Sequence, residues 1–186
     1  NLLGHLSGVA TATSQWADAI VSTNAKVRDT RKTTPGMRAL EKYAVRCGGG
    51  VNHRMSLSDA ALVKDNHIVA AGGVAEAFAA VRAAAPSIVL EIEVDTIDQL
   101  RTALSAGADL VLLDNMKPEV LREAVAIAAQ HLASTGRAVV LEASGGLTLE
   151  NAQSVAATGV NYISVGALTH SAKVLDIGLD LETIVA

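Results

Sequence analysis

The loop that decides the fold reads Asp29-Thr30-Arg31-Lys32-Thr33-Thr34-Pro35-Gly36-Met37-Arg38. An extended run at 25–28 precedes it, and a helical pattern at 37–46 follows it. Strand, polar loop and helix in this order predict a loop that carries chemistry at the carboxyl end of a strand. Its cations and hydroxyl groups suit an anionic ligand, because Arg31 can clamp a carboxylate or phosphate and Lys32 adds a second charge. A solvated basic turn has the same composition, so the loop alone does not decide between the two.

The rest of the chain alternates short apolar runs with helical patterns. The runs, of four to seven residues and rich in Val, Ile and Leu, predict parallel βαβ units with right-handed crossovers. The expected strands are 26–29, 61–64, 88–94, 110–114, 138–142 and 162–165, with a weaker one at 175–179. The expected helices are 2–20, 37–46, 73–84, 96–105, 118–133 and 148–157.

Polar residues end almost every expected strand, and this distribution favours a barrel over an open sheet. A barrel gathers all its strand ends around one mouth, whereas an open sheet scatters half of them. The dinucleotide-binding pattern G-x-G-x-x-G does not follow the first strand. Eight complete units need about 200 residues or more. For 186 residues we therefore expect a single α/β domain, an incomplete or distorted TIM-like (β/α) barrel of about seven parallel strands.

Two further strand ends carry basic side chains. In Gly48-Gly49-Gly50-Val51-Asn52-His53-Arg54 the consecutive glycines let backbone amides approach a ligand, although a flexible connection has the same pattern. His53 and Arg54, which follow directly, favour the functional interpretation. Lys64 ends an otherwise apolar strand, so it must either pair with a carboxylate or face the mouth, and we expect the mouth.

The third expected strand carries alternating carboxylates. Glu91, Glu93 and Asp95 share one side, where they would repel one another unless cations or a metal ion lie nearby. The next strand ends in Asp114. Glu93 and Asp114 are therefore candidate oxygen ligands for a Mg²⁺ ion that also holds substrate phosphates. An internal ion-pair network with Lys64 and Arg54 is the alternative, and the residues do not decide between them.

Two late loops, 142–146 and 164–171, are rich in small residues. Small residues between a late barrel strand and a helix start suit a phosphate group, because backbone amides can point at its oxygens. Two such loops side by side predict a phosphate site. A zinc site is not expected, since the histidines are scattered and the single cysteine has no partner.

Composition excludes several classes of partner. Aromatic residues make up only 2% of the chain, too few to stack the bases of single-stranded nucleic acid. A net charge of −4 removes any general attraction to DNA or anionic membranes. The lone Cys47 excludes an internal disulfide and fits a reducing compartment. We therefore expect a cytoplasmic protein that binds small anions, with neither nucleic acid nor membrane as a partner.

Six motifs occur in order along the chain. They are Asp29-Thr-Arg-Lys-Thr-Thr-Pro-Gly, Gly48-Gly-Gly-Val-Asn-His-Arg, Lys64-Asp-Asn-His, Glu91-Ile-Glu-Val, Leu113-Asp-Asn and Glu142-Ala-Ser-Gly-Gly. Together these motifs closely resemble the quinolinate phosphoribosyltransferase family. That resemblance implies a decarboxylating transfer in NAD biosynthesis: quinolinate and phosphoribosyl pyrophosphate give nicotinate mononucleotide, pyrophosphate and CO₂, with Mg²⁺.

The resemblance also implies a role for each strand end. Quinolinate carries two carboxylates, which basic side chains would hold, while the small-residue loops would take phosphate. The implied quinolinate ligands are Arg31, His53, Arg54 and Lys64, and the implied phosphate ligands are Ser144, Gly145, Gly146, Gly166 and His170. Lys32, which would meet phosphoribosyl pyrophosphate, is expected to be catalytic together with Glu93 and Asp114, the two implied Mg²⁺ ligands.

Members of the family that this chain resembles carry an additional N-terminal domain, which packs over the barrel mouth of a neighbouring subunit. This chain starts just before the expected barrel. We therefore expect residues 1–186 to be the barrel domain without that N-terminal domain, and the family's homodimer or higher oligomer to form through it. We also expect the barrel alone to be poorly active, because its mouth stays open to water.

Three other functions stay open at this point. A sister phosphoribosyltransferase that uses nicotinate without decarboxylation needs to hold only one carboxylate, so the pair Arg31 and Arg54 argues against it. A phosphosugar isomerase or aldolase would use Lys64 as a Schiff-base lysine. A regulatory module would bind phosphorylated metabolites without turnover.

Overall fold

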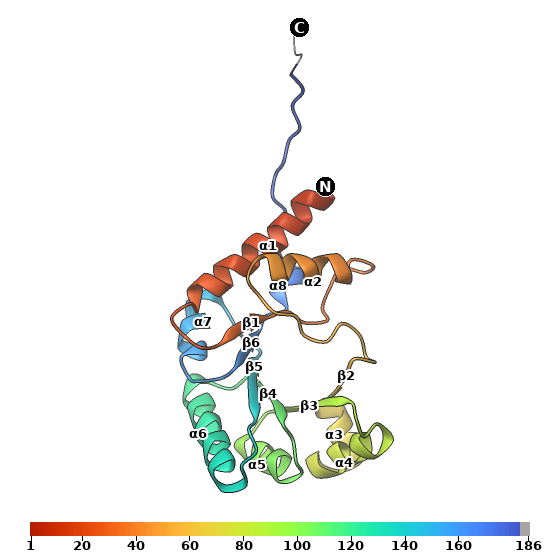
Figure 1. Cartoon of the computed structure of the whole chain (residues 1–186), viewed down its shortest axis with the longest axis vertical. Helices are drawn as coiled ribbons and strands as arrows, with labels where there is room; N and C mark the ends of the chain where they lie inside the picture. The colour runs from red at the N-terminus through yellow and green to blue at the C-terminus, as the bar shows by residue number, and fades with distance from the viewer. Residues whose placement is uncertain (183–186) are drawn as a thin grey trace.

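The computed structural model describes residues 1–182, and its centre is a sheet of six parallel strands (Figure 1). The strand order is β1-β6-β5-β4-β3-β2, so the first strand of the chain lies beside the last. The strands are β1 (Lys26–Arg28), β2 (Ala60–Val63), β3 (Val89–Val94), β4 (Leu110–Asp114), β5 (Val140–Ser144) and β6 (Tyr162–Ser164).

Helices connect successive strands, as parallel pairing requires. In Figure 1 α1 lies along the top of the body, and α5 and α6 cover the lower side of the sheet. The helices are α1 (Leu2–Ala19), α2 (Arg38–Cys47), α3 (Asp65–Ala71), α4 (Val74–Ala84), α5 (Ile97–Ser105), α6 (Pro118–Thr135), α7 (Leu149–Ala156) and α8 (Ala167–His170).

The sheet bends into an incomplete barrel. β1 pairs with β6 in the register Val27↔Ile163, which brings the two ends of the chain order together. On its other side β1 meets only an isolated bridge, Arg28↔Val51, and no ladder joins that segment to β2 in the described chain. The expectation of an α/β, TIM-like barrel that is incomplete is therefore confirmed, with the opening between β1 and β2.

The strand count was overestimated by one. Within the described residues, 175–179 forms no strand, and its link to the body is a hydrogen bond from the Leu175 backbone N–H to the Gly4 carbonyl on α1, 3.0 Å long. Apolar residues alternate there, but alternation makes a strand only where a neighbouring strand supplies hydrogen bonds. The sequence patterns also missed two short helices, α3 and α8.

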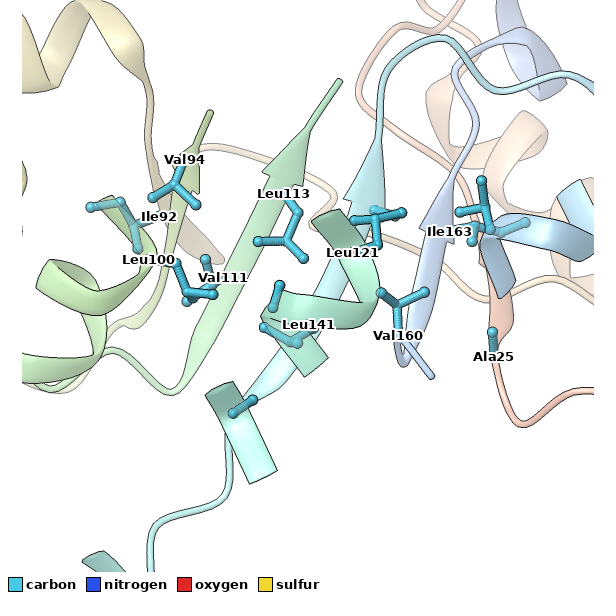
Figure 2. Packing of buried hydrophobic residues seen from close by; sticks show 14 of the residues in the cluster. Ala25, Ile92, Val94, Leu100, Val111, Leu113, Leu121, Leu141, Val160 and Ile163 are labelled. Atoms are coloured by element: carbon cyan, nitrogen blue, oxygen red, sulfur yellow. The ribbon is translucent and has the colours of Figure 1, made fainter. Parts of the chain in front are cut away.

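The two-residue period of the strands separates core from cavity. Val111 and Leu113 of β4 are fully buried among the helices, with Leu121 of α6 beside them (Figure 2). Burying such a side chain contributes about 1.5–3 kcal/mol. The residues between and after them, Leu112 and Asp114, line a cavity on the other face. The same alternation in β3, β5 and β6 directs their polar residues to that face.

Among the described residues, no single helix has the length and hydropathy of a membrane span. The helices α3 and α4, which meet at a bend of 91°, have that length and hydropathy only when they are counted as one segment.

Candidate active site

The carboxyl ends of the strands surround one cavity of about 740 Å³. Every residue that the sequence indicated as a ligand or catalytic group lies on its wall. They come from the carboxyl ends of all six strands and the loops after them, and from the segment 53–54 between α2 and β2. These residues are Arg31, Lys32, His53, Arg54, Lys64, Glu93, Asp114, Ser144, Gly145, Gly146, Gly166 and His170. The structure brings them together, and their individual roles stay predictions.

The loop after β1 forms the basic wall of the cavity and is held in place on both sides. The Arg38 guanidinium on α2 donates to the Arg31 carbonyl (3.3 Å), and the Thr169 hydroxyl on α8 donates to the Lys32 carbonyl (2.7 Å). The Arg31 Nε is buried and has no hydrogen-bond partner within residues 1–182. A buried donor without a partner costs free energy, which an anionic ligand in the cavity would recover.

A buried ion pair fixes the segment that carries His53 and Arg54. Asp29, at the end of β1, pairs with Lys42 of α2, and its carboxylate accepts the His53 backbone N–H at 2.7 Å. The Asn52 side-chain amide donates to the same carboxylate at 2.6 Å. Burial lowers the pKa of Lys42, and the bond to Asp29 opposes that effect. Asp29 therefore ties residues 51–54 to the first strand at the rim of the cavity.

A buried cluster of His53, Glu91 and Glu142 borders the cavity, and His53 and Glu142 lie on its wall. The His53 Nε2 is 3.0 Å from the Glu91 carboxylate and 3.5 Å from that of Glu142. Arg28 pairs with Glu142 from the other side, and the Ser164 hydroxyl donates to it. Burial raises the pKa of Glu142, the neighbouring Glu91 raises it further, and Arg28 opposes both.

The spacing of these three side chains would suit a metal ion, but their hydrogen bonds argue against one. The His53 Nδ1 accepts the Arg54 backbone N–H at 2.7 Å, so the ring proton of a neutral His53 lies on Nε2. A metal ligand must offer a lone pair at that atom. The arrangement therefore indicates a buried polar network in which Arg28 supplies the positive charge opposite Glu142. Both nitrogens of His53 face protein atoms, and its ring lines the cavity.

The acidic wall consists of Glu93 and Asp114. The Lys64 ammonium lies 2.6 Å from the Glu93 carboxylate, so Lys64 both lines the cavity and pairs with an acid. Burial raises the pKa of Asp114, and the charges of Glu93 and Asp95 raise it further. Asp95 itself is exposed and does not line the cavity. Two carboxylates close enough to repel are the hard oxygen donors that Mg²⁺ prefers, so the residues fit this ion.

The loops after β5 and β6 complete the wall with small residues. Gly145 and Gly146 adopt φ values of 85° and 60°, which glycine adopts without strain. A Cβ on Gly145 would lie only 2.2 Å from the Asn115 Oδ1, so no larger residue fits there. These loops let a ligand approach the backbone closely, which a phosphate group requires.

Several cavity residues were not selected from the sequence. Glu142 and Ser164 line the cavity, and so do Thr30 and Asn115. For Glu142 and Ser164 a signal existed. Each stands between two apolar core residues, so strand alternation alone places its side chain on the inner face. No comparable signal identifies Asn115, because its position depends on a left-handed turn after the strand.

Relatives of known name resemble this chain closely. The carboxylating nicotinate-nucleotide pyrophosphorylase of Mycobacterium leprae (strain TN) is 56% identical over 181 residues, covering 97% of this chain and 62% of the relative. The corresponding protein of Homo sapiens is 42% identical over 184 residues, covering 97% of this chain and 61% of the relative. The chain thus spans about three fifths of the length of these relatives.

Solved structures agree in fold. NadC from Streptococcus pyogenes matches with a TM-score of 0.87 and 44% identity, covering 95% of this chain and 60% of that one. Nicotinate-nucleotide pyrophosphorylase from Ehrlichia chaffeensis matches with a TM-score of 0.88 and 42% identity, covering 96% and 63%. A family model described as the C-terminal domain of quinolinate phosphoribosyl transferase matches residues 9–180. This chain therefore belongs to the quinolinate phosphoribosyltransferase family.

Proposed function

We propose that this chain carries the catalytic cavity for decarboxylating phosphoribosyl transfer, in which quinolinate and phosphoribosyl pyrophosphate give nicotinate mononucleotide, pyrophosphate and CO₂. The observation that carries the proposal is a single cavity with a basic wall, an acidic wall and two loops of small residues. The names of the relatives support the same reaction. Membership of the family supports it as well.

The basic wall accounts for recognition of a dicarboxylate. Arg31 offers a buried Nε without a partner, and Arg54 is oriented by a bond from its guanidinium to the Ala60 carbonyl (2.7 Å). Burial lowers the pKa of Arg54, and the charge of Arg31 lowers it further. Two guanidinium groups near each other favour an anion between them, and quinolinate has two carboxylates to offer.

The reaction needs no covalent nucleophile. The pyridine nitrogen of quinolinate forms a bond to the anomeric carbon of the ribose while the bond from that carbon to pyrophosphate breaks. Positive charge develops at the anomeric carbon, and a carboxylate of the acidic wall can stabilise it. At about 4 Å and an effective dielectric constant of about 20, one such charge is worth about 4 kcal/mol before desolvation.

Decarboxylation follows from the charge on the ring. Once the nitrogen carries ribose it is positively charged, and the electron pair of the breaking carbon–carboxylate bond can remain on the ring carbon until a proton replaces CO₂. In the proposal Glu93 and Asp114 hold Mg²⁺, which when bound neutralises the charge on the diphosphate. Lys32, the loop after β5 and the loop after β6 bind the phosphate groups.

We also propose a cytoplasmic location and a homo-oligomer. The single Cys47 is exposed and unpaired in the described chain, which fits a reducing compartment. Assembly of a homodimer or larger oligomer, as the family resemblance implies, is proposed for the protein that contains this chain. Light scattering of that protein would measure its subunit number.

The function is tested by following both products of the reaction. Purified protein is given phosphoribosyl pyrophosphate, Mg²⁺ and quinolinate labelled at the carboxylate that is lost. We expect labelled CO₂ and nicotinate mononucleotide in equal amounts. Turnover of nicotinate without CO₂ release would favour the non-decarboxylating alternative. Trapping of an aldehyde substrate on Lys64 by borohydride would favour the aldolase alternative.

A further inference from the structure

Asn115 has the most unusual backbone near the cavity. It directly follows Asp114 at the end of β4, and its φ is 53°. Within the described chain it is the one residue other than glycine with a positive φ. Asparagine tolerates the left-handed region better than most residues, but glycine adopts it at lower cost. A residue held in this region needs a compensating interaction, and such residues concentrate at functional sites.

The compensating contacts join two parts of the cavity wall. The Asn115 side-chain amide donates to the Asp114 carboxylate at 2.7 Å, and its backbone N–H donates to the Ser144 carbonyl at 2.8 Å. Its side-chain oxygen sits against Gly145, where a Cβ would come within 2.2 Å. Asn115 therefore contacts the acidic wall on one side and the loop after β5 on the other.

We propose that Asn115 is a positioning residue: its left-handed backbone and its side-chain amide hold the Asp114 carboxylate in one orientation and at a fixed separation from the loop 144–146. This inference rests on the proposed function, in which Asp114 faces Mg²⁺ and the loop faces phosphate. A ligand that bridges the two would then meet a preformed site. Outer residues that orient metal ligands act in this way in many metal sites.

Two substitutions separate the backbone from the amide. Asn115→Gly keeps the left-handed turn without strain and removes the amide, and Asn115→Asp keeps the shape and replaces the donor with a carboxylate that repels Asp114. Asn24→Gly is the matched control, because Asn24 is exposed and lies before β1, at the opposite end of the sheet. If Asn115 only shapes a turn, Asn115→Gly changes nothing at the site.

The experiment measures binding by calorimetry and stability by thermal unfolding. We expect Asn115→Gly to unfold at the wild-type temperature or above it, and to lose about 10–100-fold in Mg²⁺-dependent affinity for phosphoribosyl pyrophosphate. Its affinity for quinolinate should equal that of the wild type, and Asn24→Gly should bind both ligands normally. Wild-type affinity for phosphoribosyl pyrophosphate in Asn115→Gly overturns the proposal. If that variant does not fold, Asn115→Asp is judged by the same measurement.

A second measurement separates this inference from the proposed function. If the wild type does not bind phosphoribosyl pyrophosphate with Mg²⁺, the proposed function fails. The positioning role is then decided by crystal structures of the wild type and Asn115→Gly without ligands. Several orientations of Asp114 in the variant support the role, and a single orientation shared by both proteins overturns it.

Discussion

Asp29→Asn should destabilise the chain far more than its small change in shape suggests. Asp29 is fully buried and pairs with Lys42, whose side chain is 1% exposed. The substitution removes the negative charge and leaves the ammonium group buried without a counter-ion. It also weakens the bonds from the His53 backbone (2.7 Å) and the Asn52 amide (2.6 Å) that hold the segment 51–54.

The expected cost follows from the burial of both partners. Removing one member of a buried ion pair costs about 3–5 kcal/mol, a large part of the roughly 5–15 kcal/mol that stabilises a typical domain. Because burial already lowers the pKa of Lys42, the ammonium in the variant can lose its proton, and this limits the cost. The exposed pair of Arg137 and Asp109, 2.5 Å apart, gives a matched control: Asp109→Asn should cost about 0–1 kcal/mol.

Urea unfolding followed by circular dichroism measures these free energies. A double variant, Asp29→Leu with Lys42→Met, removes both charges and should recover much of the loss. The reasoning is refuted if Asp29→Asn unfolds within about 1 kcal/mol of the wild type, as the exposed control is expected to do.

Three further predictions concern the pH dependence of stability, the room for a side chain at Gly145, and the turnover of residues 1–186. Because the pKa of Glu142 is raised, the folded chain keeps a proton there at pH values at which the unfolded chain has lost it. The stability of the wild type relative to Glu142→Gln should therefore fall as the pH rises from the ordinary glutamate pKa through the raised one. Glu150, whose pKa is lowered by its own backbone N–H and by Thr148, should show the opposite slope against Glu150→Gln; equal slopes in urea titrations would contradict both signs. Gly145→Ala should lower the affinity for phosphoribosyl pyrophosphate, because its Cβ would collide with Asn115, whereas Gly72→Ala, also left-handed but in open space, should leave calorimetric binding unchanged. Residues 1–186 alone should bind phosphoribosyl pyrophosphate yet release CO₂ slowly, because water can enter a cavity mouth that the family's additional N-terminal domain would cover. Full turnover by residues 1–186 would show that entry of water at the mouth does not limit the reaction.

The strand pattern predicted the residues of the cavity wall better than the buried ion pair of Asp29 and Lys42 that supports them. The two-residue period places Glu93 and Asp114 on the cavity face because apolar neighbours face the helices. The pair of Asp29 and Lys42 could not be found in this way, because a lysine in a helical pattern normally faces water. Its burial depends on how α2 packs against α1 and on the pairing of Lys42 with Asp29 just after β1, which are tertiary contacts that no local pattern encodes.

Turn geometry limited the prediction in the same way. The left-handed turn at Asn115 is held by contacts with Ser144 at the end of β5 and with Gly145 just after it, both of which are distant in the sequence. The weak strand at 175–179 was predicted from alternation alone, and the described chain provides no neighbour to pair with it. Local periodicity therefore predicted which face each strand residue takes, and long-range contacts decided the rest.

The most direct test of the central claim is calorimetric titration with quinolinate and, with Mg²⁺ present, with phosphoribosyl pyrophosphate. We expect the wild type to bind both ligands, Arg31→Ala to lose quinolinate binding, and Glu93→Ala to lose the Mg²⁺-dependent binding of phosphoribosyl pyrophosphate. Neither ligand binding to the wild type, or both variants binding both ligands normally, would contradict it.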